Sequence, residues 1–166
     1  MPRNPTSEYF NERLQAISSQ ITPQSTSTLQ ITKMAERDPI TCHALDTTTG
    51  RPAPGINVSL ICLSEESTIF RAITNADGRI ANWRNEQENA TSKKVGELIV
   101  EGGKIKNQNL PMGSSMWKLR FETGAYYGYE NTFFPCVELN FVVKEGEHFH
   151  VPLLLGPYSY TTYRGS

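Results

Sequence analysis

From residue 40 onwards, the sequence consists of short stretches in which apolar and polar residues alternate. Apolar residues occupy every second position in Met116–Phe121 and again in Val137–Val143, as in strands that bury one face and expose the other. Residues typical of turns separate the stretches, as in Asn75–Gly78, where Gly78 can adopt a positive φ. Seven or eight short strands at this spacing predict an all-β sandwich. The expected strands are 41–45, 56–63, 68–73, 116–121, 137–143, 148–155 and 158–163.

The strands belong to one expected domain, residues 39–166, which follows a flexible N-terminal extension, residues 1–38. Ser, Thr, Gln and Pro dominate from Thr22 to Gln30, and such a segment has little to bury. Within the extension we expect one short helix that ends before Pro23, because apolar residues recur at i, i+4, i+7 and i+11. These residues are Phe10, Leu14, Ile17 and Ile21.

A long polar segment, residues 85–115, interrupts the strand pattern. A connection of this length is unusual in a compact domain unless it is functional or mobile. Its periodicity is weak, so we expect a surface insertion with a strand at Glu97–Glu101. After the insertion, Ala125–Asn131 predicts one or two helical turns.

The composition excludes several classes of protein. A net charge of -1 without a basic stripe argues against electrostatic binding of nucleic acid. No apolar run approaches the ~18 residues of a membrane span, and the N-terminus lacks the apolar region of a signal peptide. The three cysteines show no CxxC spacing, which argues against a disulfide framework or a zinc knuckle. We therefore expect a soluble intracellular protein.

The three histidines are the candidate chemical groups. His148 and His150 are two residues apart on one expected strand, so their side chains project from the same face. His43 lies on an early strand that could reach the same sheet. Three interpretations remain open from the residues alone: a zinc site with three histidine ligands, surface histidines without a function, and acid–base chemistry near the ordinary histidine pKa of ~6.5.

Acid–base chemistry on an anionic or enolised substrate also needs cations. The planar fork of arginine suits a planar polar ring. Periodicity does not choose among the candidates, which are Arg51, Arg71, Arg79, Arg84, Arg120 and Arg164.

Four motifs together resemble the 5-hydroxyisourate hydrolase family of transthyretin-like proteins, which act in urate breakdown. They are His43–Ala53, Thr74–Arg79, His148–Leu155 and the C-terminal Tyr163–Ser166. The resemblance covers about residues 40–166 apart from the insertion. The terminal Tyr-Arg-Gly-Ser is typical of the enzymes and is absent from the transthyretin hormone carriers.

The resemblance implies a sandwich of two four-stranded sheets with one short helix, assembled as a homotetramer with sites at the dimer–dimer interface. The implied reaction converts 5-hydroxyisourate to 2-oxo-4-hydroxy-4-carboxy-5-ureidoimidazoline without a metal or another cofactor. The implied site residues are His43, Arg79, His150 and the terminal Tyr163, Arg164, Gly165 and Ser166, and we add His148 as a further candidate for substrate contact.

In this interpretation, Arg79 and Arg164 hold the substrate ring and stabilise the oxyanion. His43 and His150 position a water molecule and exchange its proton, and the sequence leaves open which of them is the base. Ser166 supplies a hydroxyl and the terminal carboxylate. Two alternatives remain: a transthyretin-like carrier of small ligands without catalysis, and a zinc-dependent hydrolase.

The N-terminal extension carries a second resemblance. Arg13–Ile21 is similar to the type-two peroxisomal targeting signal, although its last position holds Ile21 where Leu, Ala or Phe is usual. A helix with one apolar stripe suits recognition by a receptor. We therefore expect a peroxisomal protein that binds an import receptor, with a cytoplasmic enzyme carrying a disordered tail as the alternative.

Overall fold

The predicted strands all lie within one structural unit, Arg37–Ser166. The computed structural model describes residues 37–64, 68–87, 92–105 and 109–165 of the chain. The expected helix of the N-terminal extension and the targeting-like segment Arg13–Ile21 lie outside the described residues.

The first sheet joins the beginning of the domain to its end. Strand β1 pairs in parallel with β9, and β10 pairs antiparallel with the other side of β9. Two very short strands, β2 and β5, pair with different parts of the free side of β1. The strands of this sheet are β10 (Ser159–Thr162), β9 (Phe149–Gly156), β1 (Ile40–Asp46), β2 (Arg51–Pro52) and β5 (Arg79–Ile80).

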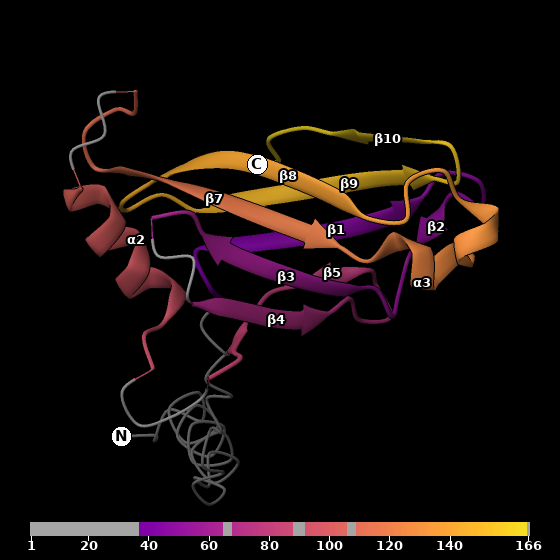
Figure 1. Ribbon diagram of the computed structural model, residues 1–166, viewed down its shortest axis with the longest axis horizontal. Coiled ribbons are helices and arrows are strands. Elements are labelled where there is room, and N and C mark those ends of the chain that lie inside the picture. The colour runs from indigo at the N-terminus through magenta and orange to yellow at the C-terminus, as the bar shows by residue number, and fades with distance from the viewer. Residues whose placement is uncertain (1–36, 65–67, 88–91, 106–108, 166) are drawn as a thin grey trace, which may run out of the picture. The chain divides into compact units, whose positions relative to one another are not determined.

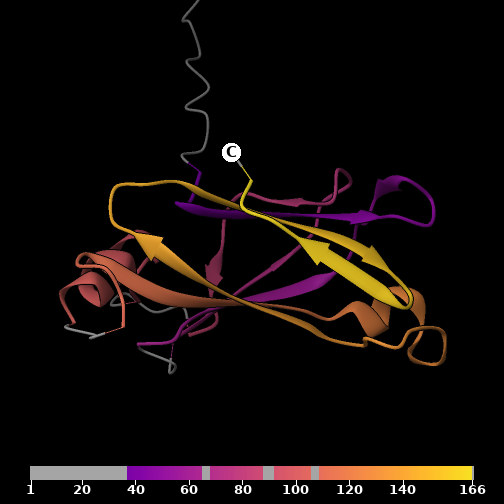
Figure 2. The same ribbon diagram turned by 90° about the horizontal axis from the view of Figure 1, so that it is seen from above.

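The second sheet is antiparallel throughout and has the order β6-β4-β3-β7-β8. Figure 2 shows that it forms a separate layer, with β7 on the opposite side of the domain from β1. Its strands are β6 (Arg84–Asn85), β4 (Ile69–Ile73), β3 (Asn57–Cys62), β7 (Ser114–Phe121) and β8 (Val137–Lys144).

The expected all-β sandwich is confirmed, and the seven strands predicted from alternation are all present. Each sheet has five strands where four were expected. The three strands that are absent from the seven predicted ranges are β2, β5 and β6, of two residues each. Two residues are too short to show an alternating pattern, so periodicity could not reveal them.

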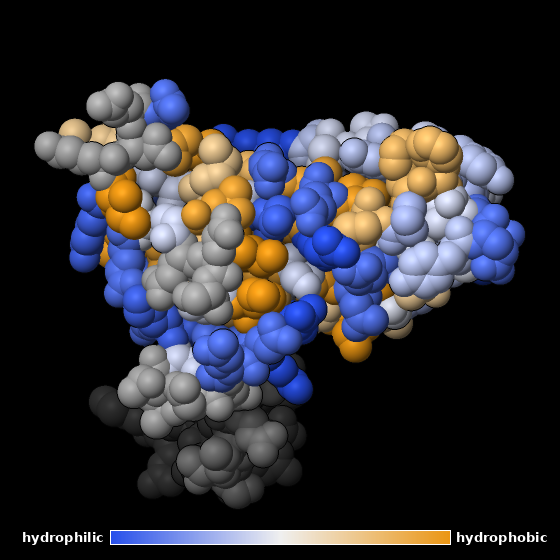
Figure 3. All heavy atoms as spheres, viewed as in Figure 1, coloured by the Kyte–Doolittle hydropathy of each residue, from blue (hydrophilic) through white to orange (hydrophobic). Residues whose placement is uncertain are grey.

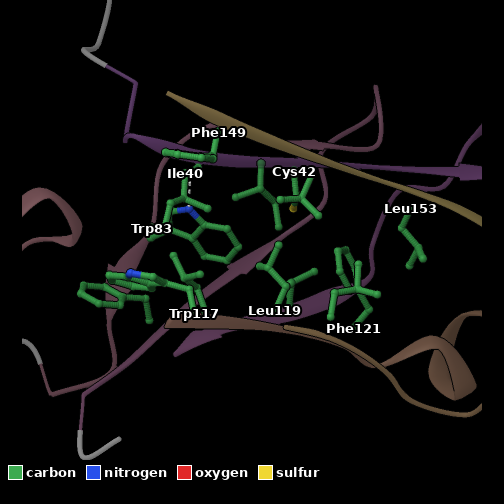
Figure 4. Packing of buried hydrophobic residues seen from close by; sticks show 14 of the residues in the cluster. Ile40, Cys42, Trp83, Trp117, Leu119, Phe121, Phe149 and Leu153 are labelled. Atoms are coloured by element: carbon green, nitrogen blue, oxygen red, sulfur yellow. Dashed lines mark hydrogen bonds between the residues drawn. The ribbon is translucent and has the colours of Figure 1, made fainter. Parts of the chain in front are cut away.

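The core lies between the two layers. Trp117, Leu119 and Phe121 of β7 are fully buried and point toward Ile40 and Cys42 of β1 (Figure 4). The alternation of β7 thus places its apolar residues on one face. The indole of Trp83 also enters this core, and its Nε1 donates a hydrogen bond to the Ile40 carbonyl over 2.7 Å, which satisfies the buried polar atom.

The insertion contains a helix, α2 (Val95–Lys104), so the prediction of a strand at Glu97–Glu101 is wrong. The helix buries positions i, i+3, i+4 and i+7, which is one helical face. It packs on β7, β3 and β8 at one end of the sandwich (Figure 1), so the insertion is part of the core as well as of the surface. The five residues Glu97–Glu101 are too few to show this period. The buried residues are Val95, Leu98, Ile99 and Gly102.

The helical turns expected at Ala125–Asn131 are confirmed as α3 (Thr123–Tyr127) and the 3-10 helix η1 (Tyr129–Asn131). The domain therefore has two helical regions, α2 and α3 with η1, where the family resemblance implies one short helix. It lies at the other end of the sandwich from α2 (Figure 1). The Tyr127 hydroxyl donates to the Leu155 carbonyl over 3.0 Å, which ties α3 to the first sheet.

The outer face of the second sheet mixes polar and apolar residues. In Figure 3, which has the orientation of Figure 1, hydrophilic side chains lie across the middle of the view with apolar areas on both sides. Arg120 contributes to this face by pairing with Glu122 at 2.8 Å and with Glu138 at 3.1 Å. Within the described parts of the chain, none of the helices has the length and apolar character needed to cross a membrane.

Because Leu98 is 1% exposed, we expect Leu98→Ala to lower the free energy of unfolding by about 2–4 kcal/mol through lost burial and a residual cavity. Chemical denaturation at one fixed protein concentration measures this change. Glu101→Ala on the exposed side of the same helix is the control, with an expected change below about 1 kcal/mol. Equal unfolding midpoints for Leu98→Ala and the wild type would show that α2 does not stabilise the core.

Candidate functional site

Three segments that are distant in sequence meet on the outer face of the first sheet. The parallel register of β1 and β9 places Thr41 beside His150, and the pairing of β1 with β5 places His43 beside Arg79. Alternation along β1 puts Thr41 and His43 on the same face, opposite to the buried Cys42. The expected group of His43, Arg79 and His150 is therefore brought together.

The two imidazoles are close neighbours. The ring centroids of His43 and His150 are 6.4 Å apart, and both side chains are half-buried. Arg79 is exposed beside them. A small polar group between the two rings could therefore contact both.

The turn before β5 fixes the backbone of Arg79. Gly78 has the positive φ expected from the sequence, at 70°. The Asn75 side-chain oxygen accepts hydrogen bonds from the backbone N–H groups of Asp77, over 3.0 Å, and Arg79, over 2.8 Å. The Gly78 carbonyl in turn accepts from the Ala44 N–H over 2.8 Å, which attaches the turn to β1.

Thr41 is a site residue that the sequence reasoning missed. Its side-chain oxygen lies 2.9 Å from His150 Nδ1 and 3.3 Å from His148 Nε2. His148 and His150 thus project from one face, as expected from their spacing. A polar residue two positions before His43 on an alternating strand was the available signal, since it must share the face of that histidine.

The C-terminal segment passes over His150. The Gly165 N–H donates a hydrogen bond to the His150 carbonyl over 2.9 Å. A Cβ atom on Gly165 would lie 2.7 Å from His150 Cδ2, so a larger residue would have to displace the imidazole or the backbone. The requirement for glycine in the terminal motif follows from this close approach. Ser166 lies outside the described residues.

Arg164 and Tyr163 do not join the imidazole cluster in the single chain. The Arg164 guanidinium pairs with the Glu147 carboxylate at 3.0 Å and lies 5.1 Å from the centre of the Phe149 ring. Its side chain is 70% exposed, so the ion pair is screened and readily exchanged for another partner. Tyr163 is also exposed. Their contact with substrate remains a prediction.

Burial and positive neighbours disfavour the charged form of both imidazoles. Desolvation, followed by the Arg79 guanidinium, lowers the pKa of His43. The same two causes lower the pKa of His150, to which His43 and His148 add. Both histidines are therefore neutral near pH 7 and able to accept a proton. The described residues include no group of three His, Cys, Asp or Glu side chains arranged to hold a metal ion.

The cluster occupies an open sheet face, and a groove adjoins it. The groove has a volume of about 400 Å³ and runs between β8 and the β9–β10 hairpin, with His150, Thr162 and Arg164 among its lining residues. His150 connects the groove to the cluster, whereas His43 and Arg79 are not among the residues that line it.

We expect Arg79→Met to raise the pKa values of His43 and His150, because the substitution removes the positive charge that opposes protonation of each imidazole. An NMR titration of the imidazole ring protons measures both midpoints. Arg84→Met, on β6 in the other sheet, is the control and should leave both midpoints in place. Unchanged midpoints in Arg79→Met would contradict the electrostatic coupling.

Comparison with known proteins gives consistent results. The family model described as HIUase/Transthyretin family matches residues 40–165. A probable 5-hydroxyisourate hydrolase of Schizosaccharomyces pombe is 38% identical over 134 residues, which cover 76% of this chain and 90% of that protein. The 5-hydroxyisourate hydrolase of Mus musculus is 35% identical over 138 residues, covering 79% of this chain and 98% of that protein.

Solved structures show the same likeness. The structure of Klebsiella pneumoniae 5-hydroxyisourate hydrolase superimposes with a TM-score of 0.53 at 31% identity, covering 76% of this chain and 98% of that chain. Sea bream transthyretin in complex with thyroxine gives a TM-score of 0.53 at 24% identity, covering 76% of this chain and 94% of that chain. This likeness shows the shared fold alone. With the family model matching most of the domain, the chain belongs to the HIUase/Transthyretin family.

Proposed function

We propose that this protein hydrolyses 5-hydroxyisourate to 2-oxo-4-hydroxy-4-carboxy-5-ureidoimidazoline in urate breakdown. The observation that carries the proposal is the meeting of His43, Arg79 and His150 on one face, with Gly165 of the C-terminal motif against His150. Relatives that align over most of their length carry the name 5-hydroxyisourate hydrolase, which supports the same substrate.

The arrangement suits hydrolysis of a cyclic amide. A neutral imidazole removes a proton from water as the water oxygen attacks the ring carbonyl carbon. The Arg79 guanidinium stabilises the negative charge that develops on the carbonyl oxygen. The C–N bond then breaks, and the imidazolium returns the proton to the leaving nitrogen. His43 and His150 are both neutral and accessible enough to take part in these transfers.

The catalytic form is proposed to be a homotetramer with its sites at the dimer–dimer interface. Within the described residues, β8 pairs only with β7 and β10 only with β9, so each has an unpaired edge on which a second subunit could add strands. Val142 and Tyr160 are exposed apolar residues on these strands. A second pair of subunits against the open outer face would enclose the substrate and exclude bulk water.

The side chains of the cluster favour hydrolysis over the alternative of a carrier without catalysis. Binding an apolar ligand requires mainly an apolar cavity with few polar groups. Here the face presents two imidazoles with lowered pKa values and a guanidinium, which are groups suited to proton transfer and charge stabilisation.

We expect the wild type to remove freshly generated 5-hydroxyisourate faster than the spontaneous reaction, as measured by its ultraviolet absorbance. His150→Asn and Arg79→Ala should each lower turnover by ~100-fold or more, because each removes a proton acceptor or the stabilising charge. Arg84→Ala is the matched control for loss of an arginine and should keep full turnover. The wild-type rate should also survive exhaustive chelation of metals.

Near-normal turnover in both His150→Asn and Arg79→Ala would contradict the assigned roles. A wild-type rate equal to the spontaneous rate would contradict the enzyme itself and favour the carrier. Loss of activity on chelation that zinc restores would favour the zinc-dependent hydrolase.

We also propose that Arg13–Ile21 directs the protein to the peroxisome through an import receptor. The support is the basic residue at its start and the apolar stripe at helical spacing. A fluorescent reporter fused behind residues 1–38 should appear in peroxisomes, and Leu14→Arg in this fusion should leave it in the cytoplasm. Thr28→Ala, outside the segment, is the control. A diffuse reporter with the unaltered extension would contradict the signal.

A further inference from the structure

The hydroxyl of Thr41 is a hydrogen-bonding centre beneath the imidazole cluster. Thr41 is only 6% exposed. Its Oγ1 lies 2.9 Å from His150 Nδ1, 3.3 Å from His148 Nε2 and 3.4 Å from the Phe149 carbonyl oxygen. Three polar atoms therefore lie within reach of one hydroxyl group, which has a single proton to donate.

Counting protons restricts the arrangement. A threonine hydroxyl has one proton to donate and two lone pairs that accept. The Phe149 carbonyl can only accept, and His148 Nε2 can accept in one of its tautomers. When the Thr41 proton goes to either of these atoms, Oγ1 is free to accept a hydrogen bond from a protonated Nδ1 of His150.

Proton uptake selects the same arrangement. An imidazolium carries a proton on both nitrogens, so its Nδ1 must donate. If neutral His150 already carries its proton on Nδ1, protonation at Nε2 leaves the contact with Thr41 unchanged. An environment already in place for the charged form needs no rearrangement during the transfer.

The two ring positions next to Cγ are both occupied. Thr41 holds the Nδ1 side, and Gly165 lies against the Cδ2 side, where a Cβ atom would come within 2.7 Å. The imidazole is therefore held at both edges near the backbone. Nε2 is the nitrogen left for contact with water and substrate.

We propose that Thr41 is a positioning residue that keeps neutral His150 protonated at Nδ1, so that Nε2 accepts the proton of the attacking water. The inference rests on the proposed function and specifies the proton acceptor within it. Water transfers its proton to Nε2 as its oxygen bonds to the carbonyl carbon. The imidazolium then returns that proton to the ring nitrogen that leaves.

The charged groups around His150 make a neutral hydroxyl suitable for this task. His43 on β1, Arg79 on β5 and His148 before β9 all oppose its protonation. In the C-terminal segment, the Arg164 guanidinium is paired with Glu147. A carboxylate at the position of Thr41 would favour imidazolium in the resting enzyme, whereas a hydroxyl orients the ring and leaves it neutral.

The test compares Thr41→Val, which removes the hydroxyl at nearly constant shape, with Thr41→Ser, which keeps it. We expect Thr41→Val to lower kcat by 10-fold or more with KM changed less than threefold, and Thr41→Ser to keep kcat within threefold of the wild type. The acid limb of the kcat profile should move to lower pH in Thr41→Val, because imidazolium loses its acceptor at Nδ1. A general loss of folded protein would produce no such shift.

The second readout does not depend on activity. Long-range proton–nitrogen NMR spectra of the full-length protein should show wild-type His150 with its proton on Nδ1, and Thr41→Val with a larger share on Nε2. A wild-type proton on Nε2 would overturn the inference, as would unchanged kcat in Thr41→Val or equal impairment of Thr41→Ser and Thr41→Val. A wild type without hydrolase activity would contradict the proposed function. The NMR spectra would still show whether Thr41 keeps the proton of His150 on Nδ1.

Discussion

The parallel pairing of β1 with β9 is the constraint on which the site depends. It joins residues 109 positions apart, Thr41 and His150, and fixes which of their side chains share a face. Because side chains alternate with a period of two, a slip of one residue would turn the imidazole of His150 toward the core. The buried Phe149 and Val151 on either side of it oppose that slip, since they would lose their burial. Core packing thus sets the register, and the register assembles the site.

The site places a positive charge beside two imidazoles and so favours their neutral form. Arg79 disfavours protonation of His43 and His150, and His43 and His148 further disfavour protonation of His150. Arg79 therefore has two effects: it stabilises negative charge on a substrate oxygen, and it keeps the proton acceptors unprotonated. Binding of an anionic transition state would partly neutralise the guanidinium, so that proton uptake becomes easier as the substrate charge develops.

Alternation predicted the long strands β7 and β8 well because apolar residues on one face of each are buried. It failed for β5, although Arg79 lies there, because a two-residue strand has no period. The turn chemistry at Gly78 was readable, since its positive φ follows from residue type. The strand prediction within α2 was wrong because Glu97–Glu101 contains only part of the buried helical face, which extends from Val95 to Gly102. The contact of Thr41 with His150 required the strand order, which a sequence pattern does not contain.

The proposed assembly would account both for the exposed position of Arg79 and for the edges of β8 and β10 that are unpaired within the described residues. A flat sheet face cannot exclude water from a reacting carbonyl, and guanidinium–oxyanion attraction is weak in a high dielectric. The chain builds the reacting groups on a rigid sheet but leaves their far side open. Assembly of subunits over this face would lower the local dielectric and strengthen the attraction at Arg79. In this arrangement Arg164, which is 70% exposed and paired with the exposed Glu147, can be redirected by a neighbouring subunit or by substrate at little cost.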